Sequence, residues 1–274
     1  MTGMNTTQWT SKLLVLALLA LTSCEKSIDP EVAKKNDDGN VIVEFRGYGS
    51  AEKVALMAFT TDGIRALSKV KTGVPTEPLG LSLEPGDYVL VAVAHSSDVT
   101  PTLKTPQQVQ FNARDGRKLT DTYCLAMDVT IGPEPTNSVE MPLKHATAAV
   151  RFRLADELPD DVTALRFDYS GGSANVNPST LEGCTRSNQT ELRTLSDDGV
   201  YVIYTFPYMA ADGVLKVTVC CLDAHGSVVQ QATLSNVSVA RGKVTTIEGC
   251  LFSDTGATLG FTVGDWNGED IHHF

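Results

Sequence analysis

The chain has 274 residues, of which 42% are hydrophobic and 20% are charged, and these values are typical of globular rather than disordered proteins. It contains 33 acidic and 22 basic residues and carries a formal net charge of −11. Because no long run of Lys or Arg is present, this acidic balance disfavours broad nucleic-acid binding through phosphate contacts.

The amino-terminal segment has the pattern of a secretory signal peptide. Lys12 precedes the only long apolar run, residues 13–21, which is shorter than the ~20 residues that a membrane-spanning helix needs. The run ends in Leu21-Thr22-Ser23-Cys24, which resembles the bacterial lipobox, in which a cysteine receives a diacylglycerol before cleavage on its amino side. We therefore predict that residues 1–23 are removed and that Cys24 becomes the lipidated amino terminus. An ordinary signal peptide with an incidental cysteine is the alternative.

Residues 24–39 are predicted to form a flexible tether, since they are polar and contain Pro30 and Asp37-Asp38-Gly39. Each buried CH₂ of a lipid chain contributes ~0.8 kcal/mol. Several acyl chains on Cys24, palmitate among them, would therefore hold the protein on a membrane without a spanning helix.

Strand patterns separated by turn residues follow the tether. In the first half, apolar or alternating segments rich in β-branched residues predict strands over residues 41–45, 54–59 and 88–93. The turn Glu84-Pro85-Gly86-Asp87 is expected to deliver Tyr88 into a buried strand. A helix is plausible only around residues 50–54 or 155–165.

The second half begins with a clear period of two. Ala148, Val150, Phe152 and Leu154 fall on one face of a predicted strand, with Ala149, Arg151 and Arg153 on the other. We interpret Lys144 and His145 as the solvated start of this strand. Further strands are predicted over residues 164–169, 201–206, 215–222, 228–234, 243–252 and 259–263.

A domain boundary is predicted near residues 142–147, because the turn-rich segment 131–138 precedes the new alternating strand. The two halves, residues 40–145 and 146–274, are each long enough for a seven-stranded sandwich. The predicted fold class is therefore all-β, with two tandem antiparallel β-sandwich domains after the signal peptide and tether.

Five cysteines remain after the predicted lipidation site: Cys124, Cys184, Cys220, Cys221 and Cys250. Neighbouring residues of a strand point to opposite faces, so Cys220 and Cys221 are not expected to bond to each other. No C-x-x-C pair indicates a redox or zinc site. We interpret the five as buried apolar side chains in strands, and the sequence leaves their disulfide state open.

Several segments in their order resemble a known family. The lipobox at Cys24, followed by the segments 83–95, 141–154, 241–252 and 261–266, is similar to the fimbrillin superfamily of Bacteroidales-type (type V) pili, and within it to FimB-like lipoprotein anchor subunits. This resemblance implies two transthyretin-like β-sandwich domains, lipidation at the outer membrane, and other fimbrial subunits as partners.

The resemblance also directs attention to Arg46. Polymerising subunits of this superfamily resemble precursors whose first strand is removed by an Arg- or Lys-specific protease, and Arg46 directly follows the predicted strand 41–45. A strand-end arginine that is never cut is the favoured interpretation. Two features favour this interpretation. Cleavage at Arg46 would separate the folded body from the lipidated Cys24. In addition, the eleven residues that follow Val263 leave little chain for a long donor strand.

No motif for an enzyme active site is present: the sequence lacks a G-x-S-x-G elbow, a phosphate-binding loop, a dinucleotide fingerprint and an H-E-x-x-H helix. We assign no catalytic, cofactor-binding or metal-binding residue and expect no cofactor. The predicted function is a surface-exposed outer-membrane lipoprotein that anchors or assembles a fimbria through β-strand contacts. The alternatives are a polymerising or tip subunit cut near Arg46, a lipid-anchored hydrolase, and a glycan-binding lipoprotein in which Trp266 could stack on a sugar.

Overall fold

The computed structural model describes residues 39–72, 76–111, 119–252 and 260–265. Within these ranges the chain forms β-strands joined by turns and loops, and no helix is long and apolar enough to cross a membrane. The all-β prediction is confirmed. The expectation of a possible helix was wrong at both places, because Lys53 already begins a strand and residues 155–163 form loop and turn.

The first sandwich contains eight of the described strands: β1 (Val41–Arg46), β2 (Lys53–Thr60), β3 (Arg65–Thr72), β4 (Leu79–Leu81), β5 (Gly86–His95), β8 (Thr122–Ile131), β9 (Asn137–Pro142) and β10 (Lys144–His145). One sheet has the order β4-β1-β9 and the other the order β10-β8-β5-β2-β3. Alternate residues of these strands, such as Val54, Leu56 and Ala58 of β2, fill one core between the sheets. Tyr88 is buried as predicted, and its hydroxyl donates to the Glu84 carbonyl.

The second sandwich contains another eight: β11 (Ala148–Leu154), β12 (Ala164–Ser170), β15 (Gln189–Thr194), β16 (Val200–Thr205), β17 (Asp212–Leu222), β18 (Val228–Ala240), β19 (Lys243–Gly249) and β20 (Gly260–Asp265). Its sheets have the orders β16-β11-β19-β20 and β15-β12-β17-β18. The predicted inner face of β11 is confirmed, because Ala148, Val150 and Phe152 lie in the core. Ala149 on the opposite face is buried as well.

Most neighbouring strands are antiparallel, but each sandwich contains one parallel pair. Strand β1 runs parallel to β9, and β11 runs parallel to β19. In both sandwiches the first strand therefore lies inside its sheet, between an antiparallel and a parallel neighbour. The predicted antiparallel β-sandwich fold is confirmed, and these two parallel pairs are features that the sequence analysis did not predict.

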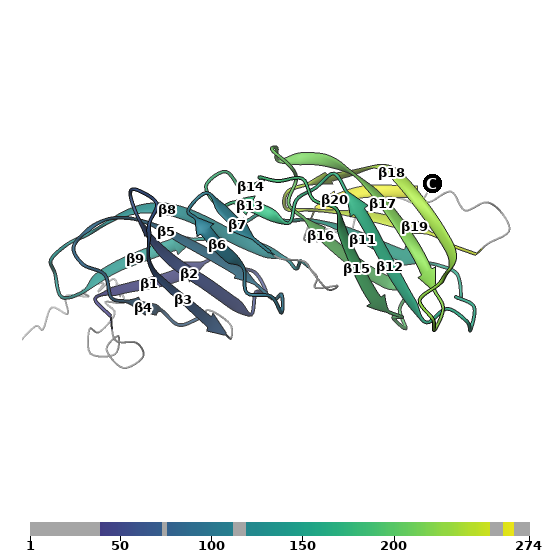
Figure 1. Ribbon diagram of the computed structural model, residues 1–274, viewed down its shortest axis with the longest axis horizontal. Helices are drawn as coiled ribbons and strands as arrows, with labels where there is room; N and C mark the ends of the chain where they lie inside the picture. Colours follow the sequence, from purple (N-terminus) through teal and green to yellow (C-terminus); the bar gives the residue numbers. More distant parts are fainter. Residues whose placement is uncertain (1–38, 73–75, 112–118, 253–259, 266–274) are drawn as a thin grey trace, which may run out of the picture.

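A fifth sheet connects the sandwiches. Its strands are β6 (Thr102–Thr105), β7 (Gln108–Gln110), β13 (Asn175–Asn177) and β14 (Glu182–Gly183), in the order β14-β13-β7-β6. It lies between the two sandwiches in Figure 1, and its central pair joins Val109 to Val176. A third core, which includes Phe111 and Phe206, packs here with side chains from both halves of the chain.

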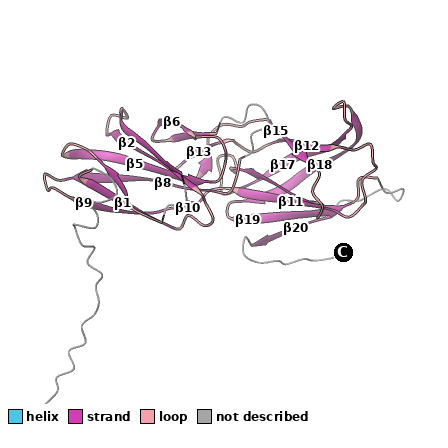
Figure 2. Cartoon of the chain, turned by 90° about the horizontal axis from the view of Figure 1, so that it is seen from below, coloured by secondary structure: helices cyan, strands magenta, loops and turns pink. Residues whose placement is uncertain are grey.

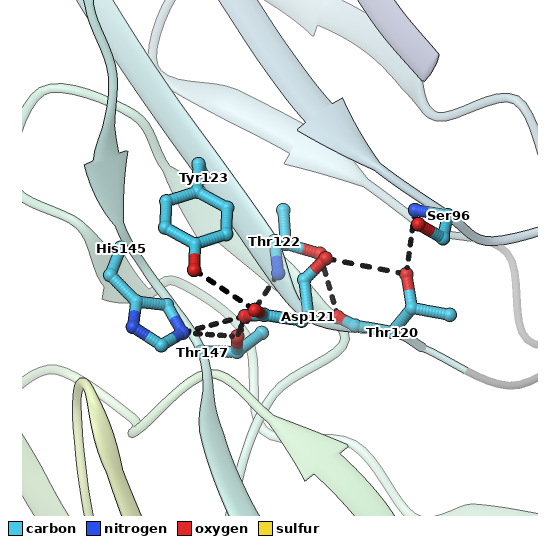
Figure 3. Close-up of polar contacts among 7 residues, drawn as sticks. All are labelled: Ser96, Thr120, Asp121, Thr122, Tyr123, His145 and Thr147. Atoms are coloured by element: carbon cyan, nitrogen blue, oxygen red, sulfur yellow. Dashed lines mark hydrogen bonds and ion pairs between the residues drawn. The ribbon is translucent and has the colours of Figure 1, made fainter. Parts of the chain in front are cut away.

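Four polar side chains beside this third core form a compact group that we call the polar joint: Asp121, Tyr123, His145 and Thr147 (Figure 3). Asp121 accepts hydrogen bonds from the Tyr123 hydroxyl (3.0 Å) and the Thr147 hydroxyl (3.1 Å), and lies 2.6 Å from Nε2 of His145. The rings of Tyr123 and His145 stack with centroids 4.6 Å apart. The interpretation of His145 as a solvated strand start was therefore wrong, because its ring connects β10 to β8 and to the start of the second sandwich.

The two faces of β11 provide a direct test of the core. Phe152 is buried with its ring centroid 5.0 Å from that of Phe167, whereas Arg151 is partly exposed. We expect Phe152→Ala to lower the free energy of unfolding by ~3–5 kcal/mol, and Arg151→Ala to change it by about 0.5 kcal/mol or less. Urea denaturation measures both. Equal losses of unfolding free energy in the two variants would contradict the assignment of Phe152 to the core face of β11 and Arg151 to its outer face.

A second prediction concerns His95, which is buried with its ring nearly perpendicular to that of Phe111, the two centroids being 5.4 Å apart. Burial, together with the nearby Lys53 ammonium, lowers the pKa of His95 from its usual 6.5 to about 4. Between these two pH values the unfolded chain binds a proton that the folded chain does not. Stability is therefore lost as pH falls from 6.5 towards 4, by up to about 3 kcal/mol.

The variant His95→Gln lacks this titration and serves as the comparison. Urea unfolding at pH 7 and at pH 4.5 should show a larger loss in the wild-type chain than in the variant. The same pH dependence in both proteins would contradict the assignment to His95.

Candidate functional site

The first strand, β1, is the best candidate for a functional site, because it is inserted between two other strands. It pairs antiparallel with β4 over Val41–Val43 and parallel with β9 over its whole length. Figure 2 shows β1 beside β9, with β10 between them and the second sandwich. The backbone of β1 therefore has neighbours on both sides at its start and one neighbour at its end.

The side chains of β1 complete the first core. Val41 and Val43 are fully buried, and Phe45 is 7% exposed. Full burial of such a side chain contributes ~1.5–3 kcal/mol, so the three together contribute roughly 5–9 kcal/mol. This is comparable to the whole stability of a typical domain, about 5–15 kcal/mol. The first sandwich thus depends on β1 for its integrity.

The start of β1 is held by Asn40. Its side-chain amide donates to the Leu83 carbonyl (2.7 Å) and its side-chain oxygen accepts from the Leu83 amide (2.9 Å). Its backbone carbonyl accepts a further bond from the Asn137 amide (2.7 Å). Asn40 therefore fixes the chain to the loop after β4 and to the first residue of β9 at the point where the predicted tether ends.

The end of β1 is Arg46, the residue considered for cleavage. Its guanidinium lies 3.0 Å from the Glu140 carboxylate, and both side chains are more than half exposed, so the pair contributes at most about 1 kcal/mol. The Arg46 carbonyl accepts from the Leu143 amide at 2.7 Å. Gly47 then turns the chain with φ of +69°, where a Cβ would lie 2.6 Å from the Leu143 carbonyl oxygen.

The two ends of β1 face different parts of the molecule. Arg46 is opposite Pro142, and Leu143 leads directly into β10 and the polar joint. Asn40 therefore lies at the other end of the strand, away from the second sandwich. The tether predicted for residues 24–39 would leave the body from this outer end.

The other predicted site residues are only partly placed. Cys24 and Trp266 lie outside the described residues, so lipidation stays a prediction. Among the described residues, no group of three or more His, Cys, Asp or Glu side chains is arranged to hold a metal ion. Sequence reasoning missed Asn40, whose only signal was a turn-forming residue directly before an apolar run.

The five cysteines are free thiols, and they differ in environment. Cys124, Cys220 and Cys221 are buried in strands as predicted, and burial raises the pKa of Cys124 to about 12 and that of Cys221 to about 11. Such thiols are poor nucleophiles at neutral pH. The prediction was wrong for Cys184 and Cys250, because Cys184 is exposed, Cys250 is half-buried, and both follow the end of a strand.

Comparisons with known proteins agree with this architecture. A family model described as fimbrillin-A associated anchor proteins Mfa1 and Mfa2 matches residues 34–271. No curated protein matches the sequence.

Solved structures give the following similarities. A candidate adhesin from Bacteroides ovatus has a TM-score of 0.52 at 15% identity, over 83% of this chain and 94% of that chain. A candidate adhesin from Bacteroides ovatus ATCC 8483 has a TM-score of 0.50 at 13% identity, over 71% of this chain and 81% of that chain. The fimbrial anchor protein Mfa2 from Porphyromonas gingivalis has a TM-score of 0.44 at 14% identity, over 82% of this chain and 97% of that chain. The first two similarities show a shared fold.

The hold of Asn40 on β1 can be tested by Asn40→Ala. This change removes two hydrogen bonds and leaves the backbone amide and carbonyl of Leu83 without the Asn40 side chain as their partner. We therefore expect the free energy of unfolding to fall by ~1–3 kcal/mol. Hydrogen exchange of the β1 amides should also become faster. Asn188→Ala, at an exposed position, is the matched control and should change neither quantity. Unchanged exchange in Asn40→Ala would show that β1 is held without this clamp.

Proposed function

Because the chain belongs to the family of fimbrillin-A associated anchor proteins Mfa1 and Mfa2, we propose that it is an outer-membrane lipoprotein that anchors or assembles a fimbria. In this proposal the acyl chains on Cys24 insert into the membrane and residues 24–39 connect them to the body. The proposal assigns no catalytic step, cofactor or metal to the chain. Its partners are other fimbrial subunits and, through Cys24, the membrane itself.

The observation that carries the proposal is the position of β1. An anchor must keep an unbroken chain from its lipid to its body, and β1 is the first element after the proposed tether. Because β1 supplies Val41, Val43 and Phe45 to the core, a chain that keeps this strand has a complete first sandwich without a partner's strand. This supports an anchor that retains β1 over a subunit that loses it.

The second candidate is a polymerising or tip subunit cut after Arg46. The exposure of the Arg46 side chain, 66%, favours access by an Arg-specific protease. Two features oppose cleavage of the folded chain: the Arg46 carbonyl is bonded to the Leu143 amide, and Gly47 adopts a positive φ rather than an extended conformation. Loss of residues before Gly47 would leave an open groove between β4 and β9.

For a chain that keeps β1, we propose that subunit contacts use a strand edge. Strand β18 is the last strand of its sheet and spans Val228–Ala240. Val228 and Val229 at its start are 44% and 43% exposed. An edge strand offers unpaired backbone groups that a neighbouring chain can join, and exposed apolar side chains add to such a contact.

The test is the amino terminus of the protein recovered from assembled fimbriae. We expect acylated Cys24 by mass spectrometry, and we expect Cys24→Ala to abolish labelling with radioactive palmitate and release the protein from the membrane fraction. Cys184→Ala removes an exposed thiol in the body of the protein and should keep both label and membrane association. A terminus at Gly47 would overturn the anchor proposal in favour of the second candidate.

A further inference from the structure

A pocket of about 480 Å³ opens on the second sandwich, where β12, β17 and β18 lie side by side (Figure 1). Its volume falls within the ~300–1,000 Å³ range of ligand pockets. Six of the residues that line the pocket have polar side chains that could contact a ligand: Ser170, Arg186, Tyr208, Lys216, Ser235 and Asn236. None of these residues belongs to β1, and Ser235 and Asn236 lie on β18, the edge strand proposed above for subunit contacts.

The pocket is built on a β-bulge. Leu215 pairs with Val237 and Val217 pairs with Leu234, so the single residue Lys216 lies opposite both Ser235 and Asn236. Asn236 has a φ of +61°, a left-handed conformation that is uncommon for residues other than glycine. Bulges of this kind bend a strand and are frequent next to binding sites.

The opposite wall is fixed by close backbone contact. Gly171 follows β12 with a φ of +103°, and a Cβ on it would lie 2.4 Å from the Val214 carbonyl oxygen. Any side chain here would push β17 away and change the pocket. The pocket is therefore shaped by the backbone and does not require rearrangement of the sheet to form.

Two cations give the pocket its charge. The guanidinium of Arg186 lies 4.9 Å from the centroid of the Tyr208 ring, a cation–π contact that restrains it. Within the described part of the chain, no ion pair involves Arg186 or Lys216. In a protein of net charge −11, these two side chains form a positive site with free donors for an anion.

The remaining lining groups indicate what kind of anion fits. Ser170, Ser235 and Asn236 offer short hydroxyl and amide groups, and Tyr208 adds an aromatic ring with its own hydroxyl. This combination suits a sugar ring with its many hydroxyls, and a guanidinium fork pairs with a carboxylate through two parallel hydrogen bonds. An acidic peptide added as a strand fits less well, because β17 is already paired with β12 and β18.

We propose that this pocket binds an acidic saccharide, with its carboxylate between Arg186 and Lys216 and its ring against Tyr208. The binding site is separate from the lipid anchor, and it shares the strand β18 with the strand edge of the proposed function, at Ser235 and Asn236 rather than at Val228 and Val229. A surface protein with such a site would attach to uronate-bearing glycans in addition to its role in the fimbria.

Isothermal titration calorimetry on the full chain in detergent tests the proposal with three probes of equal length: trigalacturonate, the neutral galactotriose and triglutamate. We expect binding of trigalacturonate, and weakening of that binding by at least tenfold in the double variant Arg186→Gln/Lys216→Gln. The matched control, Arg65→Gln/Lys104→Gln, makes the same charge change on exposed residues of β3 and β6 and should bind as the wild type does.

Three results would overturn the proposal: no binding of trigalacturonate, equal weakening in both double variants, or binding of triglutamate as tight as that of trigalacturonate. The last result would assign the pocket to an acidic peptide instead. Thermal unfolding of each variant confirms that the sandwiches remain folded. Because Cys24 and β1 are unchanged in all variants, failure here leaves the anchoring proposal intact.

Discussion

The insertion of β1 between β4 and β9 is the constraint on which the first sandwich depends. This strand joins β4 to β9 within their sheet and supplies three side chains to the core. Its parallel pairing with β9 brings the beginning and the end of the first sandwich together, so the fold closes only after residues nearly one hundred positions apart meet. The same arrangement recurs in the second sandwich, where β11 lies between β16 and β19.

The two sandwiches are joined by more than a linker. Strands from both halves share the sheet β14-β13-β7-β6, and a third core lies against it. Beside this core, Asp121 receives hydrogen bonds from Tyr123 and Thr147 and pairs with His145 (Figure 3). The apolar contacts of the third core bury surface between the two sandwiches. The polar joint fixes how the two sandwiches are oriented, because hydrogen bonds weaken when their angles change.

Strands with a regular alternation could be predicted from sequence, as the core face of β11 shows. Strand β8 could not, because its residues Thr122–Ile131 mix polar and apolar side chains and it forms by pairing with β5 along ten residues. The connecting sheet was missed since its strands have two to four residues each. Asn40 was missed because its partner Leu83 is 43 positions away, and the pocket because a bulge depends on how two strands align.

The direction of β1 also has a mechanical consequence. In a chain tethered through residues before Asn40 and loaded at the second sandwich, tension enters β1 at its first residue and leaves β9 at its last. Because the two strands are parallel, this tension slides one along the other, and the hydrogen bonds between them are strained together rather than one after another. Extraction of β1 under load is then a single high-barrier event, whose rate rather than equilibrium free energy sets how long the attachment lasts.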